Sequence, residues 1–254
     1  MLQPGTSTYP PRLAALGWSS ELHVRGAMSA GGPAVAIVGA RAASAIGMDR
    51  AHALARHLSA KQIHVVSGGA LGIDGAAHRG ALAGGGTTTV VLGTGIDVAY
   101  PARHAGLFDE VVAHGGALIS MLPPGTQPRR GTFVQRNPLI AALADVVIVV
   151  EADVKSGSLS TARAARELGR IVCAWPGSAG CDRLLAGGAA IVEGEADALA
   201  ALAGTPRASI KVAGDAVAEH VAAAIAAGAH GVDAIVRATG LPVRAVLRAV
   251  ARLS

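Results

Sequence analysis

The sequence predicts a doubly wound α/β fold of the Rossmann type, with a mostly parallel sheet and helices on both faces. Short runs of Val, Ile and Ala alternate with longer helical stretches over residues 33–203. These runs are continuously apolar, which is typical of parallel strands that are buried on both faces. Gly-rich turns follow several of the runs, as expected where a strand leads into a helix.

The expected elements follow one another in a regular order. In the first half we expect strands at 33–38, 63–67, 87–92 and 117–120, and helices at 44–60, 73–83 and 101–114. In the second half a Pro-rich loop at 123–132 precedes a helix near 135–144 and strands at 145–150 and 170–174. A helix at 159–168 lies between those strands, and a helix–strand–helix unit over 181–202 ends the sheet region.

The regions outside the sheet have a different character. Residues 1–32 are interpreted as a lead-in segment, 33–203 as the Rossmann-like domain, and 204–214 as a linker rich in Gly, Thr, Pro and Ser. The tail, 215–254, is predicted to be all-helical. Helices at 232–239 and 243–253 flank Gly240-Leu241-Pro242, where Gly suits a helix end and Pro a helix start. This pattern indicates a helix-turn-helix.

Composition narrows the class of protein. Hydrophobic residues make up 51% of the 254 residues but aromatic residues only 2%, so the core must be built from Val, Leu, Ile and Ala. The longest apolar run, 139–150, is interrupted by Asp145 and is shorter than the roughly 20 residues that span a bilayer. We therefore expect no membrane association and a cytoplasmic protein, with its two cysteines as reduced thiols. The net charge of +5 modestly favours an anionic partner.

The strand-end turns are the candidate ligand site, because open α/β sheets bind ligands at the carboxyl ends of their strands. Ser67-Gly68-Gly69-Ala70-Leu71-Gly72-Ile73-Asp74 links a strand to a helix start. Glycines permit close approach of the backbone, and a helix N-terminus favours a phosphate. Gly39-Ala40-Arg41 adds an arginine at the end of the first strand. We expect Asp74 and His78 to make structural hydrogen bonds instead of forming a catalytic pair.

Two further segments carry suitable side chains. Lys155-Ser156-Gly157 follows the strand at 145–150, where hydroxyl groups can cap a helix or bind an anion and Lys155 supplies charge. Between residues 129 and 137, arginines surround Phe133. Arginines suit a nucleic-acid backbone, and an aromatic ring stacks on a base for about 1–3 kcal/mol. Each segment is also compatible with a purely structural role, as a cap, a solvated basic loop or an inward-packed ring.

Several ligand classes are disfavoured. Arg41 and Ser44 occupy the second and third glycine positions of the dinucleotide motif GxGxxG, and the second strand ends in Ser67, where a ribose-binding acid is needed. The P-loop pattern is absent, and the cysteine spacing matches no zinc site. We therefore expect no cofactor, no metal and no catalytic residue.

Taken together, the motifs resemble those of the DNA-processing protein A family (DprA/Smf). The resemblance covers about residues 9–200. The matching segments, in order, are Tyr9-Pro10-Pro11-Arg12-Leu13, Gly39-Ala40-Arg41, residues 67–74 with Ala76-Ala77-His78, residues 92–97 with Tyr100-Pro101, Arg136-Asn137, Lys155-Ser156-Gly157-Ser158-Leu159 with Thr161-Ala162, Trp175-Pro176-Gly177, and residues 180–184.

The resemblance implies a recombination mediator and no enzymatic activity. Such proteins bind and protect incoming single-stranded DNA, load the recombinase RecA during natural transformation, and form homodimers through the Rossmann-like domain. Their small winged-helix domain resembles the tail of this chain. The DNA- and phosphate-binding residues that we expect from the family pocket and the strand-end turns are Gly39, Arg41, Ser67, Gly68, Gly69, Arg130, Phe133, Arg136, Asn137, Lys155, Ser156 and Gly157.

Three departures from the family pattern point to weaker DNA binding. Leu71 stands where the family usually has arginine, and Pro138 stands where it usually repeats arginine. The tail ends after its second expected helix, so we expect a truncated winged helix.

Two other functions remain open. A nucleoside-monophosphate phosphoribohydrolase would share the fold, but Ala164 falls where its glutamate should be, and the reaction needs that carboxylate. A regulatory protein could read duplex DNA with the helix at 243–253, which carries a basic stripe of Arg244, Arg248 and Arg252.

Overall fold

The computed structural model describes residues 1–28, 31–208, 214–241, 243, 246–247 and 249–250. The chain divides into two compact units, Met1–Arg207 and Ala208–Ser254. In the part of the chain that the structure describes, no helix combines the length and the apolar character that crossing a membrane requires.

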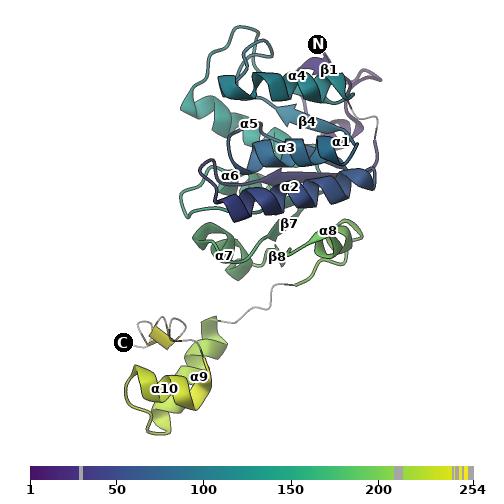
Figure 1. The fold of residues 1–254 in the computed structure, drawn as a ribbon. Helices are drawn as coiled ribbons and strands as arrows, with labels where there is room; N and C mark the ends of the chain where they lie inside the picture. The colour runs from purple at the N-terminus through teal and green to yellow at the C-terminus, as the bar shows by residue number, and fades with distance from the viewer. Residues whose placement is uncertain (29–30, 209–213, 242, 244–245, 248, 251–254) are drawn as a thin grey trace. The chain divides into compact units, whose positions relative to one another are not determined.

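The larger unit is built on one eight-stranded sheet with the order β1-β5-β4-β3-β2-β6-β7-β8 (Figure 1). The strand at one edge, β1, runs antiparallel to β5, and the other neighbouring pairs are parallel. The strands are β1 (His23–Gly26), β2 (Ala34–Val38), β3 (His64–Ser67), β4 (Thr88–Val91), β5 (Ala117–Ser120), β6 (Val146–Val149), β7 (Ile171–Ala174) and β8 (Ala190–Ile191).

Helices cover both faces of this sheet. Because successive strand residues point to opposite faces, Ala36 and Val38 belong to one buried cluster while Val35 and Ile37 belong to another. The first face packs on α1 (Pro11–Ala15), α5 (Arg130–Ala142), α6 (Ser158–Glu167) and α7 (Ala179–Ala186). The second face packs on α2 (Ala45–Ala60), α3 (Ile73–Ala83), α4 (Ala105–Ala113) and α8 (Glu195–Leu202). The predicted doubly wound α/β class is confirmed.

The strand order reverses between β2 and β6. The chain moves from β2 outward to β3, β4 and β5 on one side, then returns to β6 on the other side of β2. In such sheets the crevice outside the carboxyl ends of the two central strands is the usual ligand site. The turns after β2 and β6 border this crevice.

The lead-in segment is more structured than the sequence predicts. It contains α1, which begins at Pro11 immediately after Pro10, and β1, which extends the sheet. Tyr9, Leu13 and Leu22 are buried in the first-face cluster. The sequence did not predict β1 because the run His23–Gly26 contains a single β-branched residue. In addition, β1 pairs with β5, a segment that is distant in the sequence.

Two helices begin differently from the prediction. The expected helix at 101–114 is divided into a 3₁₀ turn, η1 (Ala102–His104), and α4. More consequentially, α5 starts at Arg130, whereas we predicted a start near residue 135. Its first turn is held by Thr132, whose hydroxyl donates to the carbonyl of Arg129 at 2.8 Å. Residues 130–132, which we predicted to end the Pro-rich loop, therefore lie on a helix.

The smaller unit contains α9 (Gly214–Ala226) and α10 (Val232–Thr239) around a small apolar cluster. The chain leaves α10 through Gly240 at φ +66, a left-handed conformation that glycine favours. Most of the second helix expected at 243–253 lies outside the described residues, including Arg244, Arg248 and Arg252. So do residues 209–213 of the expected linker.

Candidate nucleic-acid interface

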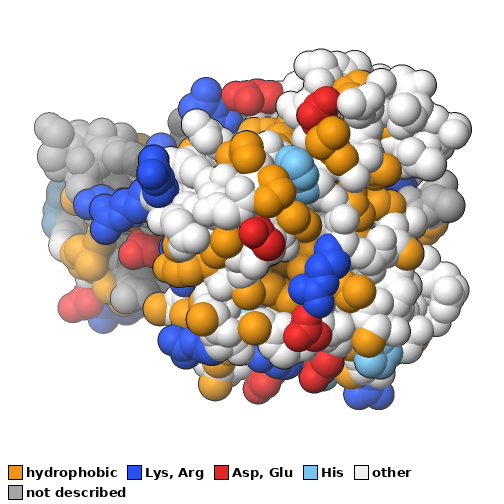
Figure 2. Space-filling view, turned by 90° about the horizontal axis from the view of Figure 1, so that it is seen from above, with side chains coloured by type: hydrophobic (Ala, Val, Ile, Leu, Met, Phe, Trp, Pro, Cys, Tyr) orange, Lys and Arg blue, Asp and Glu red, His pale blue; other side chains and the backbone are white. Residues whose placement is uncertain are grey.

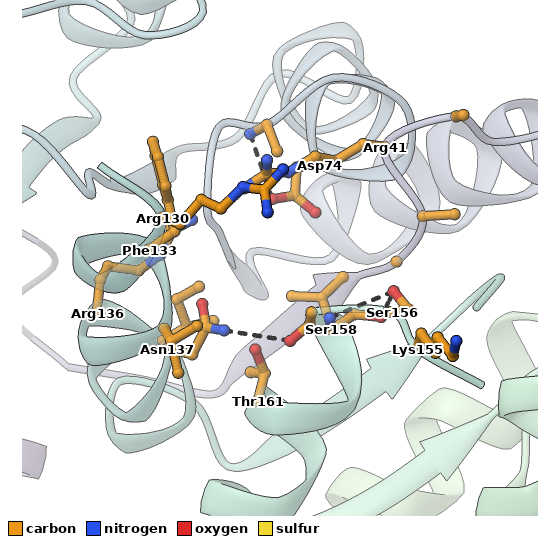
Figure 3. A pocket seen from close by; sticks show the side chains of 18 of the residues that line it. Arg41, Asp74, Arg130, Phe133, Arg136, Asn137, Lys155, Ser156, Ser158 and Thr161 are labelled. Atoms are coloured by element: carbon orange, nitrogen blue, oxygen red, sulfur yellow. Dashed lines mark hydrogen bonds between the residues drawn. The ribbon is translucent and has the colours of Figure 1, made fainter. Parts of the chain in front are cut away.

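A pocket of about 880 Å³ opens at the point where the strand order reverses. Most of its lining comes from three segments, namely the turn after β2, the turn after β6 with the start of α6, and the first half of α5. Ala70, Asp74 and Tyr100 also line it. In Figure 3, Arg130, Phe133 and Asn137 lie on one side of this pocket and Lys155, Ser156 and Ser158 on the other. Nine expected residues line it: Gly39, Arg41, Arg130, Phe133, Arg136, Asn137, Lys155, Ser156 and Gly157.

The early start of α5 brings its candidate site residues together. Arg130, Phe133 and Asn137 are spaced by three and four residues, so they lie on one face of the helix. Asn137 also ties this helix to α6, because its amide donates to the carbonyl of Gly157 at 3.2 Å and to the hydroxyl of Ser160 at 2.6 Å. The relative position of the two pocket walls is thereby fixed.

The turn that carries Arg41 is anchored through its backbone. Ala40 N–H donates to the carbonyl of Glu151 at 2.7 Å, and Ile73 N–H donates to the carbonyl of Ala40 at 3.2 Å. Gly72, at φ +73, lies so close that a Cβ atom there would clash with the Ala40 carbonyl. The backbone is thus held from two sides, while the Arg41 side chain is exposed.

Arg41 lies directly over the ring of Phe133. The guanidinium carbon is 5.0 Å from the ring centroid, which is the geometry of a cation–π contact. Tyr100 adds a second ring, with its centroid 5.3 Å from that of Phe133. Gly93 backs the Phe133 ring, since a Cβ atom there would lie 2.5 Å from Phe133 Cδ1. One wall of the pocket therefore combines a cation with two aromatic rings.

The opposite wall is the N-terminus of α6. Ser156, Ser158 and Thr161 present hydroxyl groups there, and Lys155 is exposed at the rim. The hydroxyls of Ser156 and Ser158 are 2.7 Å apart and bond to each other. The helix dipole places partial positive charge at this end, so the wall suits an anion.

The pocket is positively charged. Its lining contains five cationic side chains, Arg41, Arg129, Arg130, Arg136 and Lys155, and two carboxylates, Asp74 and Asp153. Burial raises the pKa of Asp74, and the positive charge of Arg136 opposes that rise. On the face shown in Figure 2, by contrast, basic and acidic side chains are interspersed. The pocket lining therefore carries an excess of cationic side chains.

Three of the expected residues do not line this pocket, and a fourth, Arg136, lines it but is buried. Ser67 and Gly69 do not line the pocket: the Ser67 hydroxyl donates to the carbonyl of Ile37 at 2.6 Å, and Gly69 packs against β4 and α4. Gly68 lines only a smaller cleft beside Phe133. Arg136 reaches the pocket but is 5% exposed, and its guanidinium donates to the carbonyls of Gly68 and Val91. Burial lowers the pKa of Arg136 to about 10.

Asp74 and His78 do not bond to each other. The Asp74 carboxylate accepts a hydrogen bond from the N–H of Ala70 at 3.3 Å, while His78 Nδ1 bonds to the hydroxyl of Thr88 at 2.8 Å. Each contact joins the side chain to a group within the fold. The described residues contain no cluster of three or more His, Cys, Asp or Glu side chains that could hold a metal ion.

Sequence reasoning missed several lining residues. Tyr100, Arg129, Ser158 and Thr161 all line the pocket. Ser158 and Thr161 carried a usable signal, because hydroxyl residues at a helix start both cap and bind anions. Tyr100 belongs to a segment that matches the family, but no local pattern places it beside Phe133, because that contact joins segments distant in sequence.

Comparison with known proteins identifies the family. Residues 1–203 match the family described as DNA recombination-mediator protein A. Protein Smf of Escherichia coli is 41% identical over 174 residues, which cover 68% of this chain and 46% of that protein. The chain spans about half the length of the curated relatives it matches.

Two solved structures are consistent with this family assignment. DNA processing protein A of Streptococcus pneumoniae superposes with a TM-score of 0.70 at 37% identity, covering 78% of this chain and 72% of the other. DNA processing protein A of Helicobacter pylori, whose structure is described as revealing a single-stranded DNA binding mode, gives 0.69 at 29% identity, covering 78% and 94%. The sequence match and the fold agree, and the chain belongs to the DNA recombination-mediator protein A family.

Proposed function

We propose that this chain binds single-stranded DNA in the pocket beside β2 and β6, without strong sequence preference. One observation carries the proposal: Arg41, Phe133 and Tyr100 form a cationic and aromatic wall opposite a helix N-terminus, in a pocket with an excess of positive charge. Positive grooves with aromatic rings are the usual means of holding single strands, because every base has a face that stacks.

The two walls suit different parts of a nucleotide. Lys155 and the N-terminus of α6 favour a phosphate, and the rings of Phe133 and Tyr100 favour a base. Arg41 lies between these functions, because its guanidinium covers the face of Phe133 in the free protein. A phosphate bound by Arg41 would draw the guanidinium off the ring and leave that face for a base.

Family membership supports the wider role. We infer that the chain acts as a recombination mediator that protects incoming single strands and loads RecA, as a cytoplasmic homodimer and without catalysis. The Helicobacter pylori relative, described by its single-stranded DNA binding mode, supports the ligand class. Ala164 supports the absence of glycosidic hydrolysis, because it stands where the hydrolase needs a glutamate and is buried.

The first test is a fluorescence-anisotropy titration of a labelled single-stranded oligonucleotide at two salt concentrations. Unlabelled single strands, duplex DNA and AMP serve as competitors. We expect salt-sensitive binding that single strands compete for and AMP does not, because backbone charge supplies most of the affinity. Displacement by AMP would favour a small-nucleotide site, and stronger competition by duplex DNA would favour the helical tail.

A further inference from the structure

Two arginines near His104 have no acidic partner among the described residues. They are Arg79 on α3 and Arg103 on η1, and both are exposed. Arg25, Arg163 and Arg207, by contrast, each pair with a carboxylate. The charge of Arg79 and Arg103 is therefore not neutralised locally and is available to an anion.

Arg103 immediately precedes His104 in η1, and Arg79 approaches the same histidine from α3. Arg79 reaches back along α3 toward its N-terminus, because its Nη1 atom lies 3.2 Å from the position of a Cβ atom on Gly75, and His104 Cε1 lies 2.6 Å from that position. His104 is buried and its Nδ1 bonds to the carbonyl of Gly69 at 3.0 Å. Burial is the main cause that lowers the pKa of His104, and the charges of Arg79 and Arg103 lower it further.

This cluster is connected with the main pocket. A cleft of about 50 Å³ begins at Arg41 and Phe133 and reaches Leu71, Tyr100 and Pro101. Tyr100 lines both the cleft and the main pocket, and Pro101 immediately precedes η1, which carries Arg103. A strand stacked on the aromatic wall thus has a continuous surface toward η1 and the start of α3.

The middle of that surface carries no charge. Leu71, which lines the cleft, is half-buried and uncharged. The backbone of a strand that leaves the pocket here would meet a leucine first and the two free arginines next.

We propose that Arg79 and Arg103 form a second phosphate-binding site, which holds the backbone of single-stranded DNA where it leaves the pocket over Leu71. This inference rests on the proposed function, because it extends the same binding path. It assigns the second site to the strand beyond the nucleotides that fill the pocket.

The length of the oligonucleotide distinguishes the two sites experimentally. The variants Arg79→Gln and Arg103→Gln, singly and together, are titrated with labelled oligonucleotides of about 4 and about 16 nucleotides, which bracket common site sizes. We expect the variants to bind the short oligonucleotide with the affinity of the parent protein and to bind the long one more weakly. The slope of log K against log salt for the long strand should fall by about 0.7 per arginine.

Arg163→Gln is the matched control, because it removes the same charge from an arginine that already pairs with Glu167. Arg79→Lys with Arg103→Lys should restore most of the salt dependence, since lysine also binds phosphate as a point charge. Parental binding of the long strand by the double Gln variant would overturn the second site while leaving the pocket intact. Failure of the parent protein to bind either strand would instead overturn the proposed function, and the second site with it.

Discussion

The contact between Arg41 and Phe133 allows charge and stacking to be separated by measurement. The structure places both side chains on one pocket wall, 5.0 Å apart, and they are expected to bind different parts of a nucleotide. Arg41→Ala removes a cation, and Phe133→Leu removes the aromatic face while keeping apolar volume against Gly93. Both variants should fold, because Arg41 is exposed and Phe133 is half-buried at the surface of α5.

The two substitutions should change DNA binding in different ways. Loss of base stacking costs about 1–3 kcal/mol, so Phe133→Leu should weaken binding of single strands about 5- to 150-fold with an unchanged salt slope. Loss of one phosphate contact should reduce the slope of log K against log salt by about 0.7 for Arg41→Ala. The effects of the double variant should not add, because the two residues are in contact.

Arg50 provides a matched control for Arg41. Its guanidinium lies 4.9 Å from the ring centroid of Trp175, the same kind of contact, but neither residue lines the pocket. Arg50→Ala should therefore bind single strands as the parent does. If Arg41→Ala kept the parental salt slope, Arg41 would contact no phosphate. If Phe133→Leu kept the parental affinity, no base would stack on that ring.

Three further variants test the framework beneath the pocket. Arg136→Met removes a buried guanidinium that bonds two backbone carbonyls, so it should lower the free energy of unfolding by roughly 3–6 kcal/mol, and parental stability in urea would contradict this role. Burial lowers the pKa of His64 to about 4 and that of His78 to about 3, so only the unfolded chain takes up these protons as pH falls below 6.5. Between pH 7 and pH 5 each histidine should therefore lower the free energy of unfolding by about 2 kcal/mol. The free energy of unfolding of His78→Asn, measured by urea titration, should fall correspondingly less over that range. An equal fall in the variant and the parent would disprove the low pKa of His78 in the folded protein. Gly72→Ala should destabilise the protein by about 1–3 kcal/mol and weaken DNA binding, because it strains a positive φ and displaces the turn after β2. Gly85→Ala, at φ +74 with open space around it, should show the strain without the loss of binding in the same anisotropy assay.

Local sequence patterns predicted elements well where small residues mark their ends. The helix at 73–83 and the strand at 117–120 have the predicted bounds; glycines flank the helix, and Gly116 precedes the strand. The start of α5 was wrong because Gly131 and Thr132 are poor helix formers. That helix begins at Arg130 through contacts of its own first turn and through packing on the sheet, which the pattern of its residues does not encode.

The sequence by itself determined the fold class, the family and the edge of the sheet where the site lies. It could do so because strand periodicity and strand-end turns are local features that depend on a few neighbouring residues. Only the tertiary structure decided which turns face the pocket. The order of the strands places the turns after β2 and β6 side by side, while the turn at 67–69 lies beneath Arg136. Such contacts join residues far apart in the chain, so no local pattern specifies them.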